Sequence, residues 1–468
     1  MVGTQTKHNT FWFWSNAIDF QKRGDVAYWL PTNIAATAHL PHKLSDVAKL
    51  SDLRFNPSQN PDNKFFYIDI SNINTSDGSY ETTEIRNVYA PSRARKKLKR
   101  FDVIVSTVRP NRNATSLILE DADDLVCSTG FAVLKAIKIN PFYLFVFTKT
   151  SYFIDQLVRQ TSATMYPAVN ENDVLNVGIL VPSEKDQQEV EQIVKDTFQL
   201  KQEAEKEYQE AIELFLKSIK TYILEWDTLT AETTKAFWLW SDQVDITNRI
   251  DPDYYSGEGL RNKLGKIKPL ADLAEIKIGK TPAFDDYLSS GKRRIMKFRA
   301  ITGRGIDWEN KERGFVKEEF FHKNKQNKLE KNDIVLGSAA HQAHYIGKYL
   351  DIVDGLPKEF TDGVLTVAEV MTIRPSKMLN PFVLLLFLRS GVGYELIQRQ
   401  IKGQTSHLYP KDVAGIGIPE AVIKISKSKI GAEIEGKIQS SLAKARLSKQ
   451  KLQEAKDFVE NLVKRNGA

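Results

Sequence analysis

The sequence predicts an α+β protein: two similar mixed α/β domains joined by two long helices that form an antiparallel coiled coil. Three observations predict this fold. Short motifs occur twice in the same order, strand-like runs alternate with turns inside each copy, and each copy ends in a long amphipathic stretch, the first of which contains no Gly or Pro. The two copies are expected to form a pseudo-twofold internal repeat.

The duplication appears in motifs that return roughly 230 residues later. Their spacing grows slowly along the chain, as small insertions would make it grow between diverged copies of one fold. A period this long indicates two tandem domains and not a solenoid. The paired motifs are Arg23, Asp25 and Tyr28 with Arg249, Asp251 and Tyr254; residues 44–48 with 270–274; residues 97–105 with 328–336; Asn140-Pro141 with Asn380-Pro381; Arg159-Gln160 with Arg399-Gln400; and Tyr166-Pro167 with Tyr409-Pro410.

Composition indicates a folded, soluble protein of 468 residues, with 41% hydrophobic and 10% aromatic residues. The net charge of +7 is compatible with an anionic partner but does not by itself establish nucleic-acid binding. A single cysteine, Cys127, excludes an internal disulfide framework and a multi-cysteine zinc site, and fits a reducing cytoplasm. We expect no signal peptide and no membrane partner, because the apolar runs are far too short to span a bilayer.

Local signals place the boundaries. Strand-like runs at 64–70 and 101–106 lie between turns, Asn140 followed by Pro141 predicts a helix start, and Ser183 three residues before Asp186 predicts the cap of the first long helix. The predicted parts are an N-terminal segment (1–43), a first globular domain (44–182), a first long helix (183–225), a connector (226–268), a second globular domain (269–419) and a second long helix (420–468).

Both long stretches carry one apolar or small residue every three or four positions, as in a coiled coil. The first stripe is Val190, Ile193, Thr197, Leu200, Ala204, Tyr208, Ala211, Phe215, Ile219 and Tyr222; the second is Ile430, Ile434, Ile438, Leu442, Ala445, Ser448, Leu452, Ala455, Val459 and Leu462. A helix of roughly 40 residues is about 60 Å long. Each stripe needs a partner, so we expect the helices to pair with each other. The alternative is that each packs on its own domain.

Basic residues cluster at 92–100 and 292–304, and a polar loop follows the strand after Asp102 in one copy and after Asp333 in the other. Lys and Arg hold DNA phosphates, while Arg, Asn and Gln read base edges. The alternative is an ordinary solvated face, but the loops share a position and differ in sequence. The candidate DNA-binding residues are Arg109, Asn111, Arg112 and Asn113 in the first copy, and Lys280, Arg293, Arg294, Arg299, Arg304, His341, Gln342 and His344 in the second.

No catalytic residues or metal ligands are expected. Asn140-Pro141 and Asn380-Pro381 are only half of the Asn-Pro-Pro-Tyr motif of amino-methylating DNA enzymes, and a helix cap explains them. Gly279-Lys280-Thr281 lacks the first glycine of a phosphate loop. His341 and His344 have ligand-like spacing but no carboxylates nearby.

The order of these motifs resembles the specificity subunit of type I restriction-modification systems over essentially the whole chain. The resemblance rests on residues 270–274 followed by 279–282, on the strand and loop at 102–109, and on residues 179–182 before a Gln-rich helix start. After Pro419, Lys and Ser replace the usual Glu-Gln start, so the second long helix departs from the family there.

The resemblance implies two target-recognition domains, each reading half of a bipartite site in double-stranded DNA, with the coiled coil setting the gap. It also implies two modification subunits that bind adenosylmethionine and methylate adenine, and a restriction subunit that translocates DNA with ATP. The chain itself would then need no cofactor. Two alternatives remain: an autonomous methyltransferase or nuclease with a degenerate site, and a structural adaptor that never touches DNA.

Overall fold

The computed structural model describes residues 40–121, 123–161, 167–230, 260, 263–309, 314–360, 362–402 and 406–466. The chain divides into two compact units: unit 1 is Met1–Leu200 with Arg446–Ala468, and unit 2 is Lys201–Ala445. The repeated motifs at Arg23 and Arg249, the predicted segment 1–43 except its last residues, and most of the predicted connector lie outside the described residues. Within the described residues, every helix is too short or too polar to cross a lipid bilayer.

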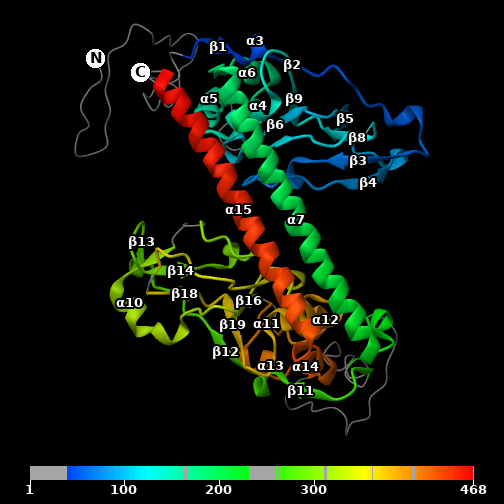
Figure 1. The fold of residues 1–468 in the computed structure, drawn as a ribbon, viewed down its shortest axis with the longest axis vertical. Coiled ribbons are helices and arrows are strands. Elements are labelled where there is room, and N and C mark those ends of the chain that lie inside the picture. The colour runs from blue at the N-terminus through cyan, green and yellow to red at the C-terminus, as the bar shows by residue number, and fades with distance from the viewer. Residues whose placement is uncertain are drawn as a thin grey trace. The chain divides into compact units, whose positions relative to one another are not determined.

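Unit 1 contains two four-stranded sheets (Figure 1). The first is antiparallel in the order β2 (Ala48–Leu50), β9 (Phe131–Ala136), β6 (Val103–Ser106) and β7 (Thr115–Leu117). The second has the order β4 (Thr83–Arg86), β3 (Lys64–Ile68), β8 (Leu125–Ser128) and β5 (Ala94–Lys97), with β3 and β8 parallel. A short antiparallel strand pair, β1 (His42–Lys43) and β10 (Gly178–Ile179), lies just before the start of the first long helix.

Unit 2 repeats this plan. Its first sheet has the order β12 (Ala274–Ile278), β19 (Val370–Pro375), β16 (Ile334–Gly337) and β17 (Leu350–Ile352). Its second has the order β13 (Tyr287–Leu288), β15 (Phe315–Val316), β14 (Arg294–Met296) and β18 (Val364–Thr366), with β14 and β18 parallel. The short pair is β11 (Ile267–Pro269) with β20 (Gly417–Pro419). The shared strand order confirms the predicted internal repeat.

Three helices occur in the same order in both domains, and two short helices of unit 2 have no counterpart among the described helices of unit 1. Unit 1 has α3 (Leu44–Val47), α4 (Pro141–Lys149), α5 (Ser151–Gln160) and α6 (Glu171–Leu175); unit 2 has α10 (Glu318–Lys323), α11 (Pro381–Arg389), α12 (Gly391–Gln398), α13 (Pro410–Ala414) and α14 (Glu420–Ser426). Helices α4 and α11 are apolar around most of their circumference and are buried on nearly every face. They form the centre of the hydrophobic core in their units.

The Asn-Pro motif starts α4 and α11, as the sequence predicts. The side-chain oxygen of Asn140 accepts from the backbone N–H groups of the first turn, and Pro141 occupies the first helical position. The amide of Asn140 also donates to Glu191, at 2.5 Å, and that of Asn380 donates to Glu435, at 2.7 Å. These residues therefore cap a buried helix and tie it to the long helix of the same unit.

The first long helix, α7 (Glu184–Tyr222), begins where the sequence predicts. The hydroxyl oxygen of Ser183 accepts from the N–H of Asp186, at 3.2 Å, and the hydroxyl donates to the Asp186 carboxylate, at 2.6 Å. The predicted start of the second long helix is wrong. Helix α14 ends at Ser426, and α15 (Lys429–Asn466) begins after Ser428, whose hydroxyl accepts from the N–H of Gly431 and so starts a new helix.

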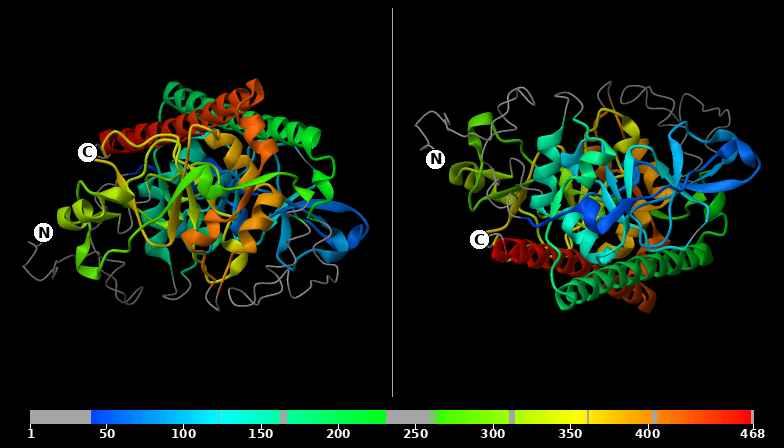
Figure 2. Two further views of the ribbon diagram at one scale, coloured as in Figure 1. Left: turned by 90° about the horizontal axis from the view of Figure 1, so that it is seen from below. Right: turned by 90° about the horizontal axis from the view of Figure 1, so that it is seen from above.

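In unit 2, α7 and α15 lie side by side and run antiparallel, as Figure 1 and Figure 2 show. Ser441 donates to the backbone oxygen of Ala204 at 2.6 Å, a close approach that small side chains permit. Lys444 pairs with Glu207 and Lys437 pairs with Glu210. The residue numbers rise along α7 as they fall along α15, so the two helices run in opposite directions. The predicted pairing is thus confirmed in this unit.

The same pairing occurs in unit 1. Ser448 donates to the backbone oxygen of Thr197 at 2.9 Å, and Lys451 pairs with Asp196 at 3.1 Å. The predicted stripes are largely buried, and the exceptions are at their ends: Tyr222 is 52% exposed and Ile430 is 39% exposed. The long helices also pack on the domain cores, so the alternative arrangement contributes to each unit as well.

Replacing Asn140 with Ala is expected to destabilise unit 1 by about 1–2 kcal/mol, because the helix loses its cap and Glu191 loses a donor. Asn140→Ser should lose less, since Ser still caps but is too short to reach Glu191. The check is the urea midpoint of unfolding for both variants against the unchanged chain. Equal midpoints for Asn140→Ala and the unchanged chain would contradict this role.

Candidate nucleic-acid interface

In unit 1, the loop after strand β6 is held by two residues with left-handed backbone. Arg109 (φ 51°) and Asn113 (φ 52°) flank the 3-10 helix Pro110–Arg112. Asn adopts this conformation more readily than most residues, and the Asn113 amide donates to a backbone oxygen of α4 at 2.7 Å. Arg109 and Asn113 are half-buried, whereas Asn111 and Arg112 are exposed. The loop therefore directs Asn111 and Arg112 outward from an anchored backbone.

In unit 2, the loop after strand β16 occupies the same position. His341, Gln342 and His344 are exposed there, as predicted for a contact loop. Helix α12 anchors the loop backbone, because Tyr394 donates to the backbone oxygen of His344 at 2.9 Å and Gln398 to that of Ala343 at 3.0 Å. His344 lies on the 3-10 helix Ala343–Tyr345 and His341 lies in the bend before it, so the ligand-like spacing does not place them on one helical face.

A second segment lies beside each loop. In unit 1, Val108 pairs with Ala168, and in unit 2, Ala339 pairs with His407. The second segment thus adds the exposed residues His407 and Tyr409 to the surface of unit 2, with their rings 6.5 Å apart. Sequence reasoning missed this segment as part of a site. The repeated Tyr-Pro motif was its signal, although Tyr166 itself lies outside the described residues.

Lys280 is exposed at the same end of the sheet as the unit 2 loop. Strands β12 and β16 both pair antiparallel with β19, so both end beside its first residue, Val370. A Cβ at Gly279 would lie 2.1 Å from the backbone oxygen of Thr366. The Gly279-Lys280 sequence therefore serves a close backbone crossing, which explains the glycine without a phosphate loop.

Arg299 also lies at this end of the sheet. It is exposed on the 3-10 helix Phe298–Ala300. The ring of Phe298 packs so closely on Gly337, the last residue of β16, that a Cβ there would lie 2.1 Å from it. The structure thus brings Lys280, Arg299 and the polar loop together in unit 2.

Two predicted DNA contacts in the second copy need correction. Arg294 is 1% exposed and lies in the fully buried strand β14, with its guanidinium over the rings of Phe315 and Phe360, so DNA cannot reach it. The side chain of Arg293 is 15% exposed and pairs with both Glu318 and Asp362. Those two carboxylates neutralise the charge that a phosphate would need.

Arg304 is exposed but faces helix α7. Its guanidinium pairs with Glu205 at 2.8 Å and lies 4.3 Å from the ring centroid of Tyr208. The structure thus places this predicted DNA-binding residue against α7, in an ion pair with Glu205. The sequence could not show this, because Glu205 and Arg304 are far apart along the chain.

The basic run at 92–100 is also less available than its sequence suggests. Lys96 is buried in β5, where it pairs with Glu171 and donates to the backbone oxygen of Phe131. Lys99 pairs with Asp123. The run therefore partly stabilises the domain.

Asp102 introduces strand β6 and, with it, the unit 1 loop. Its carboxylate accepts from the N–H of Lys99 at 2.9 Å, and the residue is 2% exposed. Burial raises the pKa of the Asp102 carboxyl to about 6, although Lys135 and Lys99 act in the opposite direction. At neutral pH a desolvated carboxylate therefore lies at the start of β6, at the opposite end of the strand from the loop.

The described residues contain no group of three or more His, Cys, Asp or Glu side chains placed to hold a metal ion. The Cys127 thiol is buried, and burial raises its pKa to about 12. A thiol with so high a pKa is a poor nucleophile.

The repeated α+β units and their paired helices define a two-domain protein built by duplication, with one exposed polar loop at the same place in each copy. No protein-family model matches the chain. A curated protein, the Type I restriction enzyme HindI specificity subunit of Haemophilus influenzae, is 26% identical over 163 residues. The match covers 33% of this chain and 34% of that protein, so the chain spans about a third of the length of this relative.

Chains from solved structures of type I restriction-modification systems also match. A chain from a structure of type I R-M complex assembly is 21% identical, with a TM-score of 0.33 over 89% of this chain and 96% of that chain. The HsdS subunit from Thermoanaerobacter tengcongensis is 21% identical, with a TM-score of 0.32 over 88% and 95%. The S subunit from M. genitalium is 13% identical, with a TM-score of 0.41 over 91% and 95%. The sequence match confirms the predicted resemblance: the chain is similar to a type I specificity subunit.

The raised pKa of Asp102 predicts a pH-dependent stability. Between the ordinary pKa of 3.8 and about 6, the folded protein keeps a proton that the unfolded chain has lost, so stability falls as pH rises through this range. The full difference is about 3 kcal/mol. Asp102→Asn removes the titration and keeps an acceptor for Lys99, so its unfolding midpoint should change less between pH 4 and 6.5 in urea titrations. Parallel pH profiles for both proteins would refute the assignment.

Proposed function

We propose that this chain is the DNA-binding specificity subunit of a type I restriction-modification complex and recognises a bipartite site. One observation carries the proposal: the two domains share their strand order but present different exposed residues at the same loop, Asn111 and Arg112 in one and His341 and Gln342 in the other. A shared scaffold with divergent loops suits the reading of two different half-sites.

The exposed side chains suit base recognition. Arg forms paired hydrogen bonds with guanine, and Asn or Gln does so with adenine in the major groove. We assign Asn111, Arg112, His341 and Gln342 to base edges, and Lys280 and Arg299 to phosphates, which fix position without reading sequence. Arg109 and Asn113 support the first loop.

The chain acts in this proposal as a non-catalytic recognition subunit. Two modification subunits would carry adenosylmethionine and methylate adenine, and a restriction subunit would use ATP, so the chemistry lies with the partners. The paired helices would provide their docking surface. Two related domains in one chain would present two similar surfaces to two copies of the modification subunit.

The rival functions make different predictions. An autonomous methyltransferase would bind adenosylmethionine as an isolated chain. A structural adaptor would show no salt-dependent affinity for duplex DNA, whereas a phosphate-binding subunit loses affinity steeply as salt rises. Titrating duplex binding over a range of salt concentrations therefore separates recognition from scaffolding.

Arg112→Ala is expected to relax recognition in one half-site and leave the other unchanged. A good paired contact between an arginine and guanine contributes about 1–3 kcal/mol of discrimination. The measurement is the methylated motif, obtained by sequencing DNA modified by the reconstituted complex. The matched variant Gln342→Ala should relax the opposite half-site.

A uniform loss of affinity for all sequences with Arg112→Ala would instead identify Arg112 as a phosphate contact. If both variants relaxed the same half-site, the assignment of one domain to each half-site would be wrong.

Changing the spacer should change the gap between half-sites. One added helical turn at residues 204–211, with a matching turn in the paired part of α15, lengthens the coiled coil by about 5.4 Å, or one to two base pairs at about 3.4 Å each. Motif sequencing should then find the same half-sites with a longer gap. An unchanged gap in a complex that still methylates DNA would reject the spacer role.

A further inference from the structure

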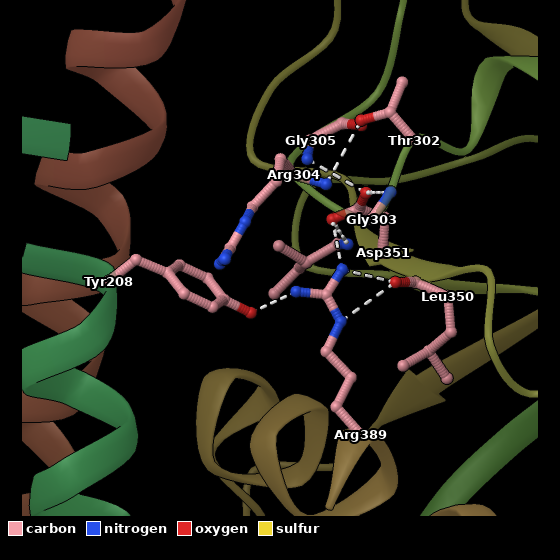
Figure 3. A network of polar contacts seen from close by, with 9 residues as sticks. Tyr208, Thr302, Gly303, Arg304, Gly305, Leu350, Asp351 and Arg389 are labelled. Atoms are coloured by element: carbon pink, nitrogen blue, oxygen red, sulfur yellow. Dashed lines mark hydrogen bonds and ion pairs between the residues drawn. The ribbon is translucent and has the colours of Figure 1, made fainter. Parts of the chain in front are cut away.

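Tyr208 on helix α7 contacts two arginines of the second domain (Figure 3). The guanidinium of Arg304 lies 4.3 Å from the ring centroid and that of Arg389 lies 5.7 Å from it. Arg389 also donates to the Tyr208 hydroxyl. Tyr208 is 4% exposed, so these contacts are largely shielded from water, where cation–π attraction is stronger.

A single buried carboxylate holds both arginine-bearing segments. Asp351 is 1% exposed and pairs with Arg389 at 3.0 Å. Its other oxygen accepts from the N–H groups of Gly303 and Gly305, each at 2.9 Å, and so fixes the loop that carries Arg304. Figure 3 shows these bonds converging beside Tyr208. The arginines are therefore preorganised around the tyrosine.

Apolar packing alone does not fix α7 at this point. A cavity of about 700 Å³ lies between α7 and the domain, next to the arginines. Its walls include Ile212 and Phe215 from α7 and Tyr349 and Leu386 from the domain. Close packing normally resists small displacements of a helix, and a cavity removes part of that resistance. The polar contacts with Tyr208 therefore add to the apolar packing of α7 residues such as Phe215 and Ile219 on the domain core.

The corresponding region of unit 1 uses different contacts: Lys149, which ends α4 as Arg389 ends α11, donates to the backbone oxygens of Thr75 and Asn113. After α4, the N–H and hydroxyl of Ser151 both donate to Glu460 of α15, at 2.9 and 3.0 Å. A helix start is thus capped by a carboxylate in unit 1, whereas unit 2 has an aromatic ring held by two cations. Within the residues that the structure describes, a tyrosine held by two arginines in this way occurs in the second domain.

We propose that Arg304, Tyr208 and Arg389 form an orientation clamp that fixes the angle between α7 and the second recognition domain and thereby restricts the accepted gap between half-sites. These are positioning residues and need not touch DNA. The inference rests on the proposed DNA function. It assigns gap selectivity to a lateral contact as well as to helix length.

Tyr208→Phe tests the clamp by removing the hydroxyl while retaining the buried ring. Arg304→Ala tests it from a side chain that is 51% exposed and whose loss leaves the core intact. The control is Lys449→Ala, which removes an exposed cation from α15 in the other unit. Each chain is assembled with its modification subunits and offered duplexes that share both half-sites and differ in gap by single base pairs.

The unchanged complex and the Lys449→Ala complex should methylate duplexes of one gap length in preference to the others. Tyr208→Phe combined with Arg304→Ala should lower the preference for that gap over its neighbours about tenfold, which corresponds to about 1.4 kcal/mol. Half-site base preference should not change. A merely structural role would lower methylation at every gap equally.

Unchanged gap preference in Arg304→Ala and in the combined variant overturns the clamp while leaving the proposed function intact. If the combined variant does not fold, Arg304→Ala alone decides. If the unchanged complex methylates no DNA, the proposed function fails, and hydrogen exchange tests the clamp by itself. The amides of Gly303 and Gly305 should then exchange faster in Tyr208→Phe, and equal exchange overturns the clamp.

Discussion

Each domain depends on one buried helix, α4 in unit 1 and α11 in unit 2, that contacts the long helices near both of its ends. At the start of α4 and α11, Asn140 and Asn380 bind glutamates on the long helix of their own half of the chain. Near the end, Ser151 binds α15 and Arg389 binds α7. Because α4 and α11 are apolar and buried, a shift of either would open cavities in the domain core. The contacts of α7 and α15 with α4 and α11 therefore help to fix the position of the sheets.

These helix contacts explain how two domains with the same fold can carry different residues on their exposed loops. Strands β6 and β16 are buried along their whole length, and the loop after each is anchored by backbone contacts to the helices behind it. The anchor is the Asn113 side chain in unit 1 and the backbone oxygens of Ala343 and His344 in unit 2, so neither anchor uses the exposed side chains at the loop tips. Asn111 and Arg112 can differ from His341 and Gln342 without disturbing the fold. Such an arrangement favours recognition sites that change independently in the two domains.

Signals close together in sequence predicted structure well, and long-range contacts did not follow from sequence. Asn140-Pro141 and Ser183 identify helix starts because a cap acts within one turn. The stripes on α7 and α15 identify pairing surfaces because helical periodicity is regular. The break at Ser428 was missed because helix-compatible residues stand on both sides of it. In the basic run at 292–304, burial of Arg294 and exposure of Arg299 depend on contacts with the second sheet, which charge alone does not reveal.

The two copies also differ in how they hold the aspartate at the start of the strand that leads to the loop. In unit 2, Arg374 donates to both carboxylate oxygens of Asp333, at 2.8 and 2.9 Å, ahead of strand β16. The equivalent Asp102 of unit 1 has Lys135 in the place of Arg374, and lysine cannot form the paired bonds of a guanidinium. Burial of Asp102 therefore costs more than burial of an aspartate held by arginine. The start of the strand is thus held more firmly in the second domain, whereas in the first the N–H of Lys99 donates to the carboxylate and lysines take the place of the guanidinium. Duplication preserved the geometry of the support and allowed its electrostatics to diverge.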